Sequence, residues 1–455
     1  MNTEVKWYNI NVDSSKELRD ILISRKTKIE KALEDISFNT MNFISYFNDF
    51  ILFNDNTLCK DLFENKLTFK TGKVVGAGKV GKASILEKNG VNVIIKSSPA
   101  KAPGYLSIRV ITYIADVTHP KDDYWRIYDV TGNRKLVTAG GDNFANQTCQ
   151  HLILNVILND NVNYLYQYDA FYCDNIGYNI TEFCNKGTLH DVFSEYTITD
   201  DIIFYGLSNV LSPLAILKDP KYHFNHSDLK GKNVFATDDG KKIIFKIADF
   251  DKSSITWNGI RFFNNSLNYL GGNRIIPQKD SEGDYVYKFN SSQLTTQVNI
   301  MHNPYGVPVS YDIYTFIISL FSIETVWNAY INERLPRLKS LMHKLFKGAS
   351  YYVIMGRIAQ DYKLVVSMSY INSILNDMDL LYDLSFVYTL CAIVPPVLET
   401  NKTEDLTIQI SNNGHICTNT CGINTKYSAS YKTCPTNRYS KQGITATSVY
   451  DWDYC

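Results

Sequence analysis

The chain has 455 residues, of which 45% are hydrophobic and 13% aromatic, and these values are typical of a globular protein rather than a disordered one. Lysine plus arginine and aspartate plus glutamate both total 46, so the formal charge is zero and nothing indicates a nucleic-acid partner. The N-terminal stretch carries acids and lacks an apolar core, and no uncharged apolar run reaches about 18 residues, so we expect no signal peptide, no membrane span and a cytoplasmic location.

The first predicted element is a helical extension over residues 1–66. Its apolar residues recur at helical spacing, but it carries no chemical motif, which favours a role in packing or in binding a partner.

A glycine-rich segment follows. Gly76, Gly78 and Gly81 form G-x-G-x-x-G between apolar runs, and an Asn-Gly turn then leads into VNVIIK, which ends at Lys96. This order predicts strand, hairpin and strand, since Asn-Gly is a strong hairpin signal. A glycine hairpin lets backbone N–H groups lie close to phosphates, because no Cβ obstructs them.

Residues 99–141 contain scattered prolines and glycines around a short segment, Leu106–Ala115, and we interpret them as an insertion. Residues 142–158 then show helical periodicity without any glutamate, and Gln147, Gln150 and His151 fall on its possible inward faces. An amide from this helix could accept a hydrogen bond from Lys96 but would not form a charge-assisted pair.

The stretch HSDLKGKNVFATDDGKKIIFKIADFD carries most of the chemistry. Asp228, Lys230 and Asn233 share one short loop, and Asp249 follows the strand-like run IIFKIA. An acid and an amide five residues apart, followed by a second acid at the end of a strand, suit phosphoryl transfer. One carboxylate orients the attacking hydroxyl, and the amide and the other carboxylate hold a divalent metal on the nucleotide phosphates.

This stretch resembles the catalytic loop and metal-binding loop of protein kinases, H-R-D-x-K-x-x-N followed by D-F-G, with Ser227 in place of the arginine and Asp251 in place of the glycine. The resemblance covers about residues 67–395. It implies an α+β, bilobal fold with a β-rich N-lobe over 67–185 and a helical C-lobe over 186–395, between the helical extension and a cysteine-containing tail over 396–455.

The resemblance also implies a Ser/Thr protein kinase that uses ATP and Mg²⁺, with Mn²⁺ as a possible substitute, and that phosphorylates serine or threonine of a protein substrate. The loss of the arginine at Ser227 implies that activation-loop phosphorylation does not switch it. The implied site residues are Asp228, Lys230 and Lys96 for catalysis, Asn233 and Asp249 for metal, and Gly76, Gly78, Gly81, Lys96, Glu182 and Cys184 for the nucleotide.

Further along the chain, the apolar run SYDIYTFIISLF resembles the central buried helix of kinases, in which Asp312 matches the acid that accepts hydrogen bonds from the catalytic-loop backbone. Cys417 and Cys421 lie close together in the tail, but free or bridged thiols are a simpler interpretation there than a zinc site. The insertions and the Asn/Tyr bias resemble kinases of large DNA viruses, which places the protein in the host cytoplasm or the virion.

Three alternatives remain open. A pseudokinase or scaffold would keep the fold without catalytic turnover. The helix over residues 142–158 favours this alternative, because it lacks the glutamate that pairs with the strand lysine in kinases. A small-molecule phosphotransferase of the aminoglycoside or choline kinase type also uses H-x-D with Asn five residues after the Asp. A structural virion protein is the third alternative, and it is compatible with kinase activity.

Overall fold

The computed structural model describes residues 70–77, 81–88, 91–99, 107–112, 133–138, 143–158, 161–173, 176–238, 242–257, 260–263, 278–288, 309–376, 378–392, 416–417 and 425–426. The predicted N-terminal extension, Gly78 and the cysteine-containing tail lie outside these residues, apart from the short paired strands β15 (Ile416–Cys417) and β16 (Thr425–Lys426).

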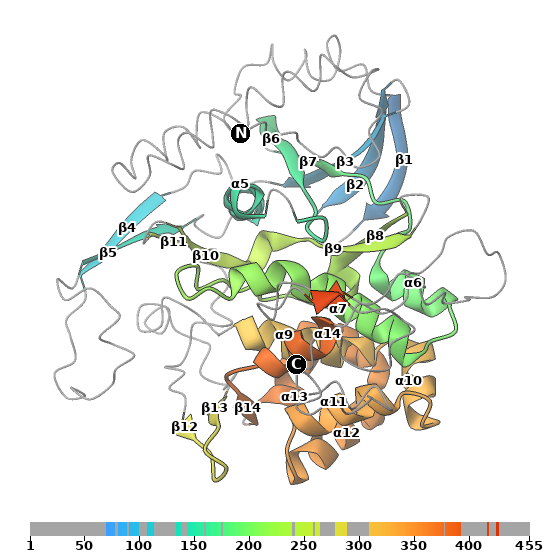
Figure 1. Ribbon diagram of the computed structural model, residues 1–455. Helices are drawn as coiled ribbons and strands as arrows, with labels where there is room; N and C mark the ends of the chain where they lie inside the picture. Colours follow the sequence, from blue (N-terminus) through green and yellow to red (C-terminus); the bar gives the residue numbers. More distant parts are fainter. Residues whose placement is uncertain are drawn as a thin grey trace.

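The smaller lobe is a five-stranded antiparallel sheet in the order β1-β2-β3-β7-β6, with helix α5 (Asn143–Ile157) beside it (Figure 1). The strands are β1 (Lys70–Ala77), β2 (Lys82–Lys88), β3 (Val91–Pro99), β6 (Gln167–Cys173) and β7 (Ile176–Glu182). The predicted strand, hairpin and strand around the glycines are therefore present as β1, β2 and β3. Packing also requires glycine at position 81, because a Cβ there would lie 2.3 Å from the Ser97 carbonyl oxygen.

The larger lobe is helical and lies below the sheet in Figure 1. Its helices are α6 (Leu189–Glu195), α7 (Asp200–Leu217), α9 (Val309–Leu320), α10 (Glu324–Ile331), α11 (Pro336–Leu345), α12 (Ala349–Gln360), α13 (Met368–Leu375) and α14 (Ser385–Ala392), with 3₁₀ turns η3 (Gly231–Asn233), η4 (Phe250–Lys252) and η6 (Tyr362–Val366). The predicted α+β, bilobal, kinase-like fold is thus confirmed.

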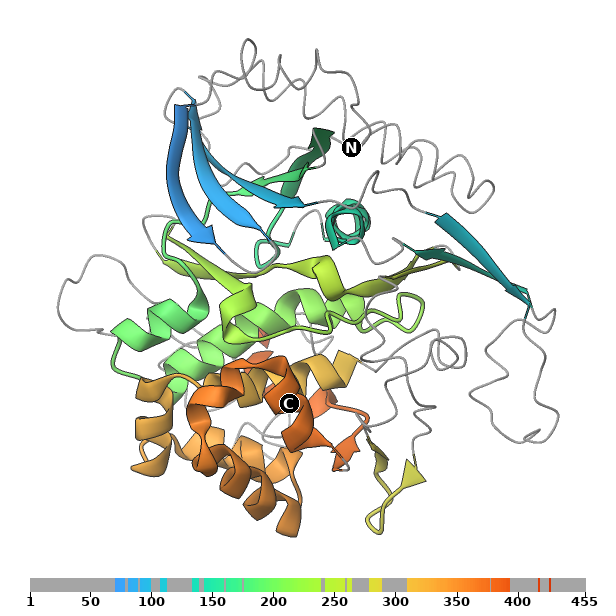
Figure 2. The same cartoon turned by 180° about the vertical axis from the view of Figure 1, so that it is seen from behind.

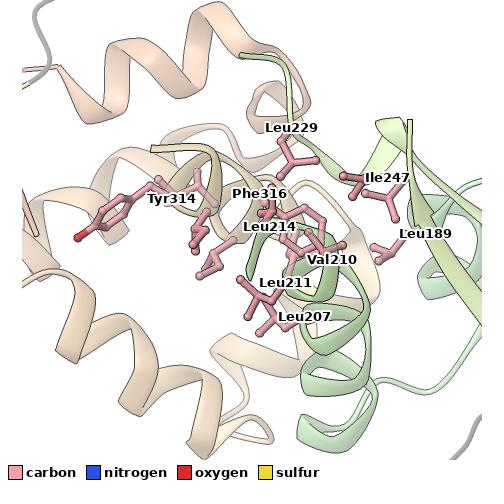
Figure 3. Close-up of a cluster of buried hydrophobic side chains, with 14 of the residues drawn as sticks. Leu189, Leu207, Val210, Leu211, Leu214, Leu229, Ile247, Tyr314 and Phe316 are labelled. Carbon is pink, nitrogen blue, oxygen red and sulfur yellow. The ribbon is translucent and has the colours of Figure 1, made fainter. Parts of the chain in front are cut away.

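Helices α7 and α9 form the centre of the larger lobe (Figure 3). Leucine and valine side chains on one side of α7 pack against α9, and each fully buried side chain of this size contributes about 1.5–3 kcal/mol. The contacts extend to Leu229 in the predicted catalytic loop and Ile247 at the end of β9 (Ile243–Ile247), so the core supports both loops that carry predicted site residues.

Among the described helices, α7 by itself is long and apolar enough to cross a membrane, and α9 with α10 would be so only as a pair bent by 84°. Two thirds of α7, 67%, is buried inside the lobe, which is the character of a core helix. Pro213 lies inside α7, and the helix continues through that residue to Leu217.

The predicted insertion forms a β-hairpin that pairs with the segment after Asp249–Asp251, the predicted metal-binding loop (metal loop). Strand β4 (Ser107–Thr112) pairs with β5 (Asn133–Thr138), and β5 pairs in parallel with β11 (Ile260–Phe263), which in turn pairs with β10 (Ser254–Trp257). In Figure 2 this hairpin projects away from both lobes. The sequence indicated only a short segment, Leu106–Ala115, and neither strand, since β11, the partner of β5, lies more than a hundred residues later.

The remaining strands are short. β8 (Val234–Asp238) pairs with β9 between the predicted catalytic loop and the predicted metal loop. A small sheet in the larger lobe consists of β12 (Gln278–Lys279), β13 (Tyr285–Lys288) and β14 (Asp379–Leu381).

Candidate active site

The predicted catalytic loop lies between α7 and β8, where the helical core holds its backbone. The backbone N–H groups of His226 and Ser227 donate to the two carboxylate oxygens of Asp312 on α9, at 2.8 and 2.9 Å. Asp312 is buried, and burial raises the pKa of its carboxyl despite these bonds. The predicted supporting role of Asp312 is confirmed by this contact.

Asp228 is buried at the centre of this loop with a charged group on each carboxylate oxygen. Lys230 Nζ donates to Oδ1 at 2.9 Å, and Lys252 Nζ donates to Oδ2 at 2.8 Å. Asn233 donates its side-chain N–H to the Asp228 carbonyl oxygen at 2.7 Å, which turns its amide oxygen away from the loop backbone. The loop therefore holds Asp228, Lys230 and Asn233 together.

Asp249 follows β9 in the left-handed backbone region, at φ 65°, which aspartate tolerates better than most residues. Its Oδ1 accepts a hydrogen bond from Lys96 Nζ of β3 at 2.6 Å, so the structure joins two site residues that are 153 positions apart. Burial by itself would raise the pKa of Asp249, but the charge and hydrogen bond of Lys96, together with the smaller effects of His226 and Lys252, outweigh it and lower the pKa to about 2. Asp249 is consequently a carboxylate throughout the neutral range.

Helix α5 contributes neutral amides where kinases have a glutamate. Gln147 Oε1 accepts from Lys96 Nζ at 3.1 Å, so the predicted amide contact with Lys96 is confirmed. The preceding residue, Asn146, donates from its Nδ2 to the carbonyl oxygens of Asp251 and Ser253 at 2.8 and 3.1 Å. Gln150 donates to the Phe262 carbonyl of β11 at 3.2 Å. Three amides therefore tie α5 to Lys96 and to the segment after Asp249.

Asp251, which stands where kinases have glycine, is buried two residues beyond Asp249. Burial and the neighbouring charge of Asp249 raise the pKa of its carboxyl to about 7. The Asn146 side chain donates to the Asp251 carbonyl oxygen, which connects this loop to α5.

The other predicted nucleotide-binding residues remain predictions, and they lie in the structure as follows. Gly76 pairs with Ala83 in the β1–β2 hairpin. Glu182 ends β7 with its side chain buried and paired with Lys246 of β9 at 3.0 Å, and its backbone N–H donates to the Tyr166 carbonyl oxygen at 3.1 Å. Cys184 lies two residues later as a free, half-buried thiol whose pKa is raised by burial.

Four rings join α5, the catalytic loop and the metal loop. Phe250 contacts His151 of α5 at 4.9 Å between ring centroids, His226 at 4.9 Å, and Tyr164 at 5.7 Å. His151 Nδ1 also lies 2.9 Å from the Tyr164 hydroxyl. Burial is the main reason that the pKa of His151 falls from 6.5 to about 3, so the ring is neutral at pH 7.

This neutral histidine predicts a loss of stability in acid. Because its folded pKa is depressed, the unfolded chain takes up the proton first, and the stabilisation present above pH 6.5 is lost as the pH falls. Between pH 7 and pH 5 the wild-type protein is expected to lose about 2 kcal/mol more unfolding free energy than His151→Phe, which cannot titrate. Urea unfolding of both proteins at the two pH values measures this difference, and parallel pH profiles would contradict it.

Sequence reasoning missed three residues of this neighbourhood: Lys252, Lys246 and Asn146. Lys252 had a usable signal, since it directly follows Asp249-Phe250-Asp251. Lys246 and Asn146 had none, because lysine on a strand and asparagine on a helix are ordinary surface residues until tertiary structure buries them.

No family model matches the sequence. A curated protein of Acanthamoeba polyphaga mimivirus named "Putative serine/threonine-protein kinase R679" is 28% identical over 373 residues, a match that covers 64% of this chain and 53% of that protein. The chain thus spans about half the length of this curated relative. In sequence and in fold, the chain resembles a divergent protein kinase of the kind found in large DNA viruses.

Proposed function

We propose that the protein transfers the γ-phosphoryl group of ATP to serine or threonine hydroxyls of a protein substrate, in the host cytoplasm or the virion. The observation that carries this proposal is the convergence of Lys96, Asp228, Asn233 and Asp249 from three separate segments, namely β3, the loop between α7 and β8, and the turn after β9. Phosphoryl transfer uses this combination of a lysine, two acids and an amide.

The donor set fits Mg²⁺ or Mn²⁺. Both prefer carboxylate, carbonyl and amide oxygens, and Asn233 keeps its amide oxygen available because its N–H is used by the Asp228 carbonyl. Asp249 needs no deprotonation before it binds a cation, given its pKa of about 2. The metal, when bound, would neutralise charge on the phosphate oxygens of ATP.

The chain's own residues would perform the remaining tasks. Lys96 binds the α- and β-phosphates, Asp228 accepts a hydrogen bond from the attacking hydroxyl and orients it, and Lys230 offsets negative charge on the transferring group. The glycine hairpin would cover the phosphates with backbone N–H groups, and the backbone around Glu182 and Cys184 would bind adenine.

We also infer that activation-loop phosphorylation does not control the site. Ser227 cannot bind a phosphate as arginine does, and internal contacts hold the segment after Asp249 instead. Ser254 and Asn225 exchange backbone hydrogen bonds at 2.9 and 3.0 Å, and Asn146 and the β5–β11 pairing anchor the same segment.

The test is transfer of label from γ-labelled ATP to a generic protein substrate in the presence of Mg²⁺, with Asp228→Asn as the control. We expect phosphoserine or phosphothreonine with the wild-type chain and background with the variant. Equal labelling by both would refute the proposal. Absent transfer with retained ATP binding would identify a pseudokinase, and transfer to small alcohols alone would identify a small-molecule phosphotransferase.

A further inference from the structure

Lys252 lies on the carboxylate that is proposed to orient the substrate hydroxyl. Its ammonium donates to Asp228 Oδ2 at 2.8 Å, opposite Lys230 at Oδ1. The Asp228 side chain is 5% exposed, whereas that of Lys252 is 34% exposed, so the lysine reaches into the site from its rim. Of the two lysines, only Lys230 belongs to the kinase pattern.

We propose that Lys252 is a second positioning lysine for phosphoryl transfer. It would fix the orientation of Asp228 and link the metal loop to the catalytic loop. The inference rests on the proposed function.

Orientation is the first reason. The Asp228 carboxylate is held at both ends, because each of its oxygens accepts a hydrogen bond from one lysine ammonium. A carboxylate offers about four acceptor positions, so Asp228 can still accept the substrate hydroxyl while both lysines remain bound. Misplacement of a reacting group by about 1 Å can cost about 100-fold in rate, which is the scale on which such fixation matters.

The second reason is the connection between the two functional loops. Lys252 ends η4, three residues after Asp249, and its bond to Asp228 sets the spacing of the two proposed functional acids. Kinases with an arginine before the catalytic aspartate couple these regions through a phosphate, and Ser227 cannot. Lys252 makes its link without any modification.

Charge balance offers a competing role that an experiment can separate. Asp251 adds a third acid to Asp228 and Asp249, and Lys252 adds a third lysine to Lys96 and Lys230. Although burial lowers it, the surrounding carboxylates raise the pKa of Lys252 above its ordinary value, so the side chain stays charged. If Lys252 served only to offset Asp251, it would be dispensable once Asp251 were replaced by glycine.

The test compares Lys252→Met with wild type in the ATP transfer assay. We expect kcat to fall about 10- to 100-fold while the KM for MgATP changes less than about threefold, because Lys96 and Asp249 are untouched. Lys252→Arg, which keeps the charge and the donor, should recover most of the loss. Lys232→Met is the matched control, since Lys232 is an exposed lysine of the predicted catalytic loop, and it should behave as wild type.

The kcat values of the chain with Lys252 and of Lys252→Met are then compared in an Asp251→Gly background. A similar loss of kcat in both backgrounds supports positioning of Asp228, whereas a loss that vanishes with Asp251 overturns it. Thermal unfolding checks that each variant is folded, and Lys252→Gln replaces the methionine variant if that one unfolds. If the wild type transfers phosphate and Lys252→Met has the same kcat, this inference alone is refuted. If the wild type shows no transfer, the proposed function is refuted and this inference with it.

Discussion

Replacement of Asp249 by asparagine is expected to lower kcat for phosphoryl transfer by about a thousandfold or more while the protein remains folded. The amide keeps the shape of the side chain and an oxygen that can accept from Lys96. It lacks the negative charge that a divalent metal needs, and with a pKa of about 2 that charge is fully present in the wild type. The measurement is steady-state transfer from labelled ATP over a range of Mg²⁺ concentrations.

Asp251→Asn is the matched control for this experiment. It removes an acid that is buried in the same turn, two residues away, but that has no part in the proposed metal site. We expect this variant to stay within about tenfold of wild type, as is usual for a neighbour that does not touch the reacting groups. An Asp249→Asn enzyme that also stays within this limit, or the reverse order of the two losses, would contradict the metal assignment.

The second large effect concerns stability. Glu182→Ala is expected to lower the free energy of unfolding by about 3–5 kcal/mol, the usual cost of breaking a buried ion pair. The Lys246 side chain is only 2% exposed and would lose its carboxylate, and the backbone N–H of Tyr166 would lose an acceptor at 3.0 Å. Burial raises the pKa of the Glu182 carboxyl against the opposing Lys246 charge, which shows that desolvation is substantial here.

The control replaces both partners, as Glu182→Leu with Lys246→Met. This double variant buries no unpaired charge, so it should lose much less stability than Glu182→Ala. Urea unfolding at pH 7 measures both variants. A single variant within about 1 kcal/mol of wild type, or a double variant that is less stable than the single one, would show that the pair is not fully desolvated.

Much of the fold and part of the site could be predicted from local sequence. Asp228, Lys230 and Asn233 lie within six consecutive residues, so any compact loop brings them together. The glycine hairpin and the strand that carries Lys96 were also readable, because turn residues and apolar alternation act over a few positions. The resemblance to kinases supplied the order of the lobes and the place of Asp312 in a buried helix.

The sequence predicted that an amide contacts Lys96, but not which residue provides it. The helix over residues 143–157 offered three inward candidates, and packing decided that Gln147 contacts Lys96 while His151 faces Phe250. Asn146 was not distinguished at all, although it makes two hydrogen bonds to the metal loop 105 and 107 residues away. Such roles depend on the rotation of the helix against another segment, and no local pattern encodes that angle.

The sequence alone determined the chemistry of this protein, namely a loop with an acid, a lysine and an amide, a second acid after a strand, and a lysine after a glycine hairpin. Only the tertiary structure decided how these groups are balanced, since it put Lys252 on Asp228, paired Glu182 with Lys246, and docked α5 through neutral amides. The physical reason is range. Backbone propensities and turns act between neighbours, whereas burial, charge pairing and hydrogen bonding act between segments that only the packed core brings together.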